Sequence, residues 1–72
     1  MKLKPVESRM ICAVGYELET SELTVVFNNG RTYCYQGVPE EDYEALLEAR
    51  SKGRFMQANI IGVYTKYHIV DK

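Results

Sequence analysis

The stretch LTVVFNNGRTYCYQ (residues 23–36) holds two segments rich in β-branched and aromatic residues, joined by Asn28, Asn29 and Gly30. Such residues favour strands, and Asn and Gly tolerate the positive φ that tight hairpin turns require. The stretch therefore predicts an antiparallel hairpin. The length of its loop decides the fold, because a shift of one residue in the pairing moves every side chain to the other face of the sheet.

Two registers of this hairpin are open. A two-residue loop pairs Val25 with Cys34 and separates the two tyrosines of the Tyr-x-Tyr motif from the apolar residues of the first segment. A three-residue loop, with Gly30 as a left-handed bulge residue, pairs Val25 with Tyr33 instead. We favour the second register because it gathers one continuous apolar face. This face consists of Leu23, Val25, Phe27, Tyr33 and Tyr35, and the residues left facing water are Thr24, Thr32 and Gln36.

A strand is predicted before the hairpin and a helix after it. Residues 10–17 are apolar and β-branched enough for a strand, and the polar segment 18–22 is typical of a turn. Pro39 suits the first position of a helix, and the acids at 40–42 suit its first turn, where they meet the positive end of the helix dipole. Apolar residues then recur at the spacing of an amphipathic helix, at Tyr43, Leu46 and Leu47.

A second short helix is predicted over residues 51–62, with Ser51 as its N-cap and Gly62 as its stop. Its expected buried residues are Phe55, Met56, and Asn59 or Ile60. Residues 63–70 alternate weakly and form either a short closing strand or an extended tail. The predicted fold class is therefore α+β, an antiparallel three-stranded meander followed by two short helices (βββαα).

Length and composition describe a small globular protein. The 72 residues allow one domain, residues 1–72, and an apolar share of 46% with a charged share of 26% is that of an ordinary folded chain. No apolar run approaches the ~20 residues needed to cross a bilayer, and the first ten residues lack the apolar region of a signal peptide. We therefore expect a cytoplasmic protein without a membrane anchor.

The inventory of reactive side chains is small. Cys12 and Cys34 both lie in predicted strands, which favours two buried thiols over a disulfide. With His68 as the only histidine and no Cys-x-x-Cys motif, we expect neither a metal nor a cofactor. A Cys34–His68 pair would need a reactive thiolate at an apolar strand position, which raises thiol pKa values. We therefore expect no catalytic residues and no enzymatic activity.

Charge is unevenly distributed along the chain. Residues 17–48 contain eight acids against Arg31 alone, a balance of −7, whereas residues 49–70 contain four bases and no acid. These bases are Arg50, Lys52, Arg54 and Lys66. Three of them fall within RSKGR (residues 50–54), at a predicted helix start, where backbone N–H groups favour a phosphate. The alternative is a solvated helix junction whose bases lie near the acidic first helix.

The paired tyrosines also have two interpretations. Exposed on a sheet, Tyr33 and Tyr35 could stack against RNA bases, each stack contributing about 1–3 kcal/mol. Buried, they would supply a large share of a small core at about 25 cal/mol per Å² of apolar surface. We favour the core, which makes the RSKGR junction the better candidate for a binding site.

Short motifs recur in a definite order across residues 8–67. They are Ser8, Gly15-Tyr16, Leu23, Val25, Phe27, Asn29-Gly30, Tyr33, Tyr35, GVP at 37–39, YEALL at 43–47, SKGRF at 51–55, Asn59-Ile60 and Tyr64. In this order and spacing they resemble the KTSC domain family, found as stand-alone bacterial or phage proteins and at the C-terminus of some lysyl-tRNA synthetases. The resemblance implies a small domain of uncharacterised role, and the synthetase fusion suggests RNA binding. The segment after Asn-Ile is often rich in arginine in that family, whereas Ile61 and Val63 here carry no charge.

Two functional hypotheses follow. The first is an RNA-binding accessory module with a tRNA-related role, which uses the four bases above together with Tyr33 and Tyr35 where they are exposed. The second is a protein-interaction or structural module that forms a homodimer through a sheet edge or a residual apolar surface. We favour the first because of the family's fusion to synthetases.

Overall fold

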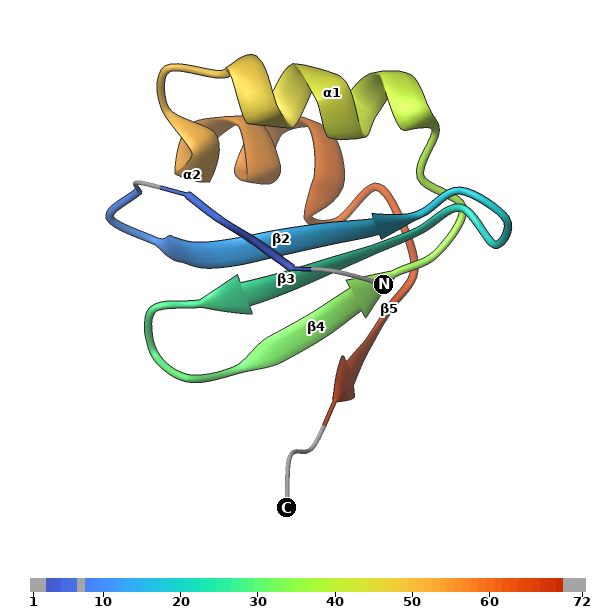
Figure 1. The fold of residues 1–72 in the computed structure, drawn as a ribbon, viewed down its shortest axis with the longest axis horizontal. Coiled ribbons are helices and arrows are strands. Elements are labelled where there is room, and N and C mark those ends of the chain that lie inside the picture. Colours follow the sequence, from blue (N-terminus) through green and yellow to red (C-terminus); the bar gives the residue numbers. More distant parts are fainter. Residues whose placement is uncertain (1–2, 7, 70–72) are drawn as a thin grey trace.

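Five antiparallel strands form one sheet in chain order, β1-β2-β3-β4-β5. A computed structural model describes residues 3–6 and 8–69 of the chain. Its elements are β1 (Lys4–Pro5), β2 (Ile11–Glu17), β3 (Glu22–Phe27), β4 (Thr32–Tyr35), α1 (Glu40–Glu48), α2 (Lys52–Phe55), the π-helical η1 (Met56–Ile60) and β5 (Lys66–Ile69). The helices lie on one face of the sheet (Figure 1). The α+β class is confirmed, and within the described residues none of the helices is long and apolar enough to cross a membrane.

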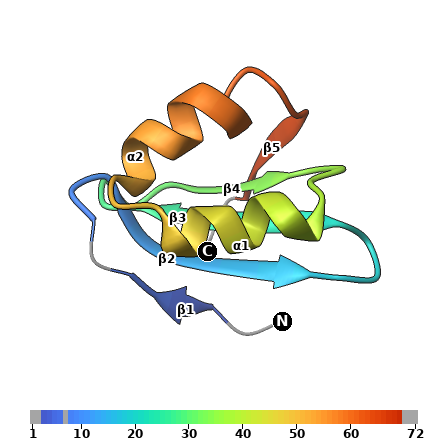
Figure 2. The ribbon, with the colours of Figure 1, turned by 90° about the horizontal axis from the view of Figure 1, so that it is seen from above.

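The sheet has one strand more at each edge than the predicted meander. β1 pairs with β2, and β5 pairs with β4 as the closing strand (Figure 2). The sequence analysis missed β1 because this strand is only two exposed residues long and contains Pro5. Proline lacks the N–H that a ladder needs and is confined to sheet edges, so it argues against a strand when the fold is unknown.

The β3–β4 hairpin has the three-residue loop. Leu23 lies opposite Tyr35 and Val25 opposite Tyr33, as the favoured register predicts. Gly30 adopts φ +89°, and its N–H donates to the Phe27 carbonyl at 3.0 Å. A residue with a Cβ is strained at this φ, so glycine allows the chain to reverse without shifting the pairing.

The helix ends lie close to their predicted positions. Pro39 is the extended N-cap residue of α1 rather than its first helical residue, with ψ 149°. Ser51 is the N-cap of α2, and its hydroxyl accepts from the Arg54 N–H at 3.4 Å. The helix continues through η1, and Gly62 follows its end at φ +81°, a conformation that suits glycine after a helix.

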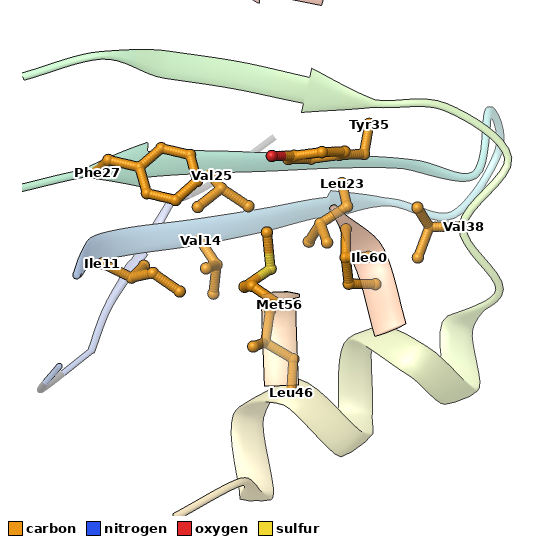
Figure 3. Packing of buried hydrophobic residues seen from close by; sticks show 10 residues of the cluster. All are labelled: Ile11, Val14, Leu23, Val25, Phe27, Tyr35, Val38, Leu46, Met56 and Ile60. Carbon is orange, nitrogen blue, oxygen red and sulfur yellow. The ribbon is translucent and has the colours of Figure 1, made fainter. Parts of the chain in front are cut away.

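The core lies between the sheet and the helices (Figure 3). Tyr35 is its largest fully buried side chain at 1% exposure. Leu46 closes the core from α1, while Met56 and Ile60 close it from η1. Of the residues predicted to be buried in the second helix, Asn59 is exposed. The remaining core members are Ile11, Val14, Leu23, Val25, Phe27 and Val38.

A bulge in β2 corrects the prediction that Cys12 is buried. The pairing shifts between Ile11 and Ala13, so Cys12 is an extra residue without a partner on β3. Ile11 and Val14, three residues apart, therefore both face the core, and Cys12 is turned outward and exposed. With regular alternation and Ile11 in the core, Val14 would have been turned away from the helices.

The face of the sheet without helices is partly covered by Tyr67. This residue of β5 lies opposite Cys34, and its hydroxyl donates to the Glu22 carboxylate at 3.3 Å, so the side chain crosses β4. Beneath it, Cys34 is 2% exposed and Thr24 is 4% exposed. The prediction that Thr24 faces water is therefore wrong, because it did not take into account that a side chain of the closing strand covers this face.

Shortening Leu46 to alanine should lower the free energy of unfolding by about 2–5 kcal/mol, because a fully buried leucine leaves a cavity. Leu18→Ala is the matched control, since Leu18 is 63% exposed and should change stability by less than about 0.5 kcal/mol. Urea unfolding of both variants measures the difference, and equal effects would contradict the packing described above.

Stability should fall at high pH through Tyr67. The adjacent Cys34 thiol, followed by lost hydration and the Glu22 carboxylate, raises the pKa of Tyr67 from 10.0 to about 12. The folded chain thus holds this proton more tightly than the unfolded chain, so the stabilisation is complete below pH 10.0 and disappears as the pH approaches 12. Urea unfolding across this window should show a shallower pH dependence for Tyr67→Phe than for the wild type. If the stability of Tyr67→Phe depended on pH as strongly as that of the wild type, the raised pKa of Tyr67 would be contradicted.

Candidate nucleic-acid interface

Acidic and basic segments lie at opposite ends of the sheet. The β2–β3 turn and the start of α1 share one end, and the start of β2, the β3–β4 turn and the α1–α2 connection share the other (Figure 1). The first end carries acids on both segments, at Glu17, Glu19, Glu22, Glu40, Glu41, Asp42 and Glu44. The second carries Arg9, Arg31, Arg50 and Lys52, with Glu48 as an acid in the last turn of α1. The uneven charge along the chain therefore becomes a separation of charge in space.

Hydrogen bonds from Asn28 hold two of the basic segments together. Its N–H donates to the Met10 carbonyl and its side-chain amide donates to the Ser8 carbonyl, both at 2.9 Å. Ser8 in turn accepts from the Met10 N–H through its hydroxyl at 3.2 Å, which turns the chain into β2. Arg9 is thus placed beside the hairpin loop that precedes Arg31.

A first pocket of about 330 Å³, the junction pocket, opens where the α1–α2 connection meets the start of β2. It is lined by Ser8, Arg9, Met10, Arg50, Ser51, Lys52 and Gly53. A Cβ on Gly53 would lie 3.2 Å from the Met10 sulfur, so glycine allows this close approach. Lys52 also has a structural role here, because its ammonium donates to the Ala49 carbonyl at 3.1 Å, at the end of α1.

A second pocket of about 190 Å³, the tyrosine pocket, lies on the helix-covered face of the sheet. It is lined by Met10, Phe27, Asn29, Arg31, Tyr33, Tyr35, Ile61 and Lys66. The Lys66 ammonium lies 4.7 Å from the centroid of the Tyr33 ring, in a cation–π contact. His68, opposite Tyr33 in the ladder, places its ring 5.0 Å away. The tyrosine pocket is therefore an aromatic site with two bases among its lining residues.

The two tyrosines of the Tyr-x-Tyr motif have different environments. Tyr35 is buried, and burial, followed by the proximity of Tyr33, raises the pKa of its hydroxyl. The favoured interpretation, in which Tyr35 belongs to the core, is thus confirmed, and Tyr35 is no part of an exposed stacking surface. Tyr33 is half-buried, and its ring meets Phe27 edge-on at a centroid distance of 5.9 Å. Of these two tyrosines, only Tyr33 keeps an aromatic surface within reach of a ligand.

The predicted bases divide between the two pockets. Arg50 and Lys52 line the junction pocket, Lys66 lines the tyrosine pocket, and the exposed Arg54 on α2 lines neither. Because Met10 lines both pockets, they are neighbours on the surface of the molecule.

Two bases of this surface, Arg9 and Arg31, were missed by the sequence analysis. Their positions in the sequence could have indicated this. Arg9 lies just before β2, and Arg31 lies just after the loop between β3 and β4. Antiparallel pairing of β2 with β3 and of β3 with β4 brings these two points to the same end of the sheet. We call Arg9, Arg31, Arg50, Lys52 and Lys66 the basic end; Lys66 belongs to it only through its side chain, because its backbone lies opposite Tyr35, near the acidic β2–β3 turn. Among the described residues, none of the side chains lining the two pockets is acidic.

The model of the KTSC domain matches residues 7–64 of the chain. The chain belongs to the KTSC domain family. The crystal structure of a KTSC domain protein from Yersinia pestis superimposes with a TM-score of 0.94 at 35% identity, covering 96% of this chain and 97% of that one. The KTSC assignment predicted from the motifs is therefore confirmed.

Two relatives extend the comparison. An uncharacterised protein of Stutzerimonas stutzeri is 35% identical over 71 residues, which cover 99% of this chain and all of that protein. A protein of Tsukamurella paurometabola is 44% identical over 54 residues, covering 75% of this chain and 81% of its own. The KTSC match includes the junction pocket and both tyrosines, whereas Lys66 and His68 lie beyond it.

The described part of the chain offers no group of three or more His, Cys, Asp or Glu side chains that could hold a metal ion. The chemistry of the site is instead that of cationic and aromatic side chains. Such groups bind anions and flat rings.

Proposed function

We propose that this KTSC domain is a non-catalytic, cytoplasmic RNA-binding module that contacts single-stranded RNA with its basic end. The observation that carries the proposal is that the junction and tyrosine pockets are neighbours, with Met10 between them and no acidic side chain among their lining residues. Five bases and one half-exposed tyrosine thereby share one surface, while the acids of the β2–β3 turn and of the start of α1 lie at the other end (Figure 1).

The arrangement suits single strands better than duplexes. A net charge of −1 is low for a protein that coats a duplex, whose binding depends on many phosphate contacts. A single strand can instead follow a small basic surface and stack an unpaired base on an aromatic ring, which contributes about 1–3 kcal/mol. The occurrence of KTSC domains at the end of some lysyl-tRNA synthetases supports an RNA partner and, within that class, tRNA.

The number of phosphate contacts sets the expected salt dependence. Four contacts to a single strand give a log–log slope of about −2.8, which weakens binding roughly 50-fold between about 50 and 200 mM salt. The fluorescence anisotropy of a labelled oligouridine at several salt concentrations measures this slope directly.

Arg50→Gln should weaken binding of the oligouridine several-fold at low salt and make the slope shallower by about 0.7, because it removes one phosphate contact. Lys4→Gln is the control: it removes the same charge from β1, at the edge of the sheet opposite β5, and should leave the slope unchanged. Equal effects of the two substitutions would indicate unspecific attraction and contradict the proposal, as would the absence of binding at about 50 mM salt.

A homodimer is the second candidate, supported by the exposed edge strand β5. All four of its residues are exposed, and a groove of about 510 Å³ beside it includes the apolar side chains of Leu3, Val26 and Ile69. Unpaired strand edges are templates for pairing with another chain. In sedimentation experiments without RNA, this candidate predicts a concentration-dependent dimer that Ile69→Lys dissociates. A monomer at all concentrations would exclude it.

A further inference from the structure

The tyrosine pocket is lined by Tyr35, whose hydroxyl makes no hydrogen bond to the described part of the protein. Tyr35 is 1% exposed and lines the pocket, and its hydroxyl points along the core toward Phe27 (Figure 3). The hydroxyls of Tyr16, Tyr64 and Tyr67 each donate to a protein oxygen. That of Tyr35 has no such partner among the described residues, and no fully buried side-chain oxygen there lacks a partner, so this hydroxyl keeps a small opening to the pocket. A phenol hydroxyl both donates and accepts, so this group is available to a ligand that enters the pocket.

The volume of the pocket limits what can enter. About 190 Å³ is below the range of roughly 300–1,000 Å³ that is usual for pockets that enclose whole small molecules. Phe27, Ile61 and Met10 provide apolar walls, and Arg31 and Lys66 provide positive charge. A flat ring fits such a site while an attached phosphate remains outside, close to the two bases.

The Lys66 ammonium covers the Tyr33 ring, on which a base would have to stack. It lies 4.7 Å from the Tyr33 centroid, a contact that is worth only about 2- to 5-fold in an equilibrium at an exposed site. Stacking of a base on an aromatic side chain is worth roughly 5- to 150-fold. A base can therefore displace the ammonium, which is then free to bind the phosphate of the same nucleotide.

From this geometry we infer that the tyrosine pocket binds one unpaired nucleobase, with Tyr33 as the stacking surface and the Tyr35 hydroxyl as its hydrogen-bonding partner. The inference rests on the proposed function. It adds the pocket in which the RNA is recognised and the single nucleobase that is recognised there. Lys66 leaves the Tyr33 ring and binds the phosphate of this nucleotide, and Arg31 binds the adjacent phosphate. The Tyr-x-Tyr motif thus serves both folding and binding through the same two rings.

A pair of oligomers separates base from phosphate. Hexauridylate and an abasic ribose-phosphate hexamer carry the same backbone charge, and only the first has bases. Wild-type protein should bind hexauridylate roughly 5- to 150-fold more tightly than the abasic hexamer. Tyr33→Leu should remove this preference, and Tyr35→Phe, which keeps the buried ring and deletes only the hydroxyl, should reduce it about 3- to 10-fold. Tyr64→Phe is the matched control, because its hydroxyl binds Asp42 in the first turn of α1, and should keep the full preference.

The outcomes distinguish the two proposals. Equal affinity of the wild type for both hexamers would overturn the inference and leave RNA-backbone binding intact, whereas failure to bind either would overturn the proposed function as well. A preference that survives in both Tyr33→Leu and Tyr35→Phe would place base recognition elsewhere and overturn the inference. Tyr35→Phe retains the core packing, so this test does not depend on the folding of the leucine variant.

Discussion

The three-residue loop between β3 and β4, closed by Gly30 in the left-handed conformation, is the constraint on which the rest of the structure depends. It aligns Leu23 with Tyr35 and so directs both into the space beneath the helices. A loop one residue shorter would send the tyrosines to the opposite face and leave the helices without the largest buried side chain of the core. The same register presents β4 to β5, which places Lys66 beside Tyr35 and His68 beside Tyr33.

Tyrosines also join the layers of the molecule. The Tyr16 ring stacks on Tyr43 of α1 at 5.0 Å between centroids, and its hydroxyl donates to the Val38 carbonyl at 2.6 Å. Tyr64 donates to Asp42 at 2.6 Å and thereby ties the segment after η1 to the first turn of α1, a bond that raises the pKa of Tyr64. With Tyr35 in the core and Tyr67 across β4, most tyrosine rings are committed to structure. Tyr33 differs because it is only half-buried and lines a pocket.

The fold was largely predictable because hairpin register, helix spacing and caps are local properties of the sequence. The exposed Cys12 and the buried Thr24 were not predictable in this way, since one depends on a bulge in β2 and the other on a side chain from β5. The site was predicted only in part. Arg50, Lys52 and Lys66 were found from the charge pattern, whereas Arg9 and Arg31 join them only when three turns meet at one end of the sheet. The charge pattern alone does not show which turns are neighbours, and Arg9 and Arg31 could have been added only by combining it with the predicted strand pairing.

An NMR titration of isotope-labelled protein with a single-stranded RNA tests the central claim most directly, because it reports every residue at once. The account predicts shift changes confined to the basic end, at Met10, Arg31, Tyr33, Arg50, Lys52 and Lys66, that fade as salt is raised. The β2–β3 turn and the first turn of α1 should remain unchanged. The absence of shifts at low salt, or shifts centred on Tyr67 and the sheet face without helices, would contradict it.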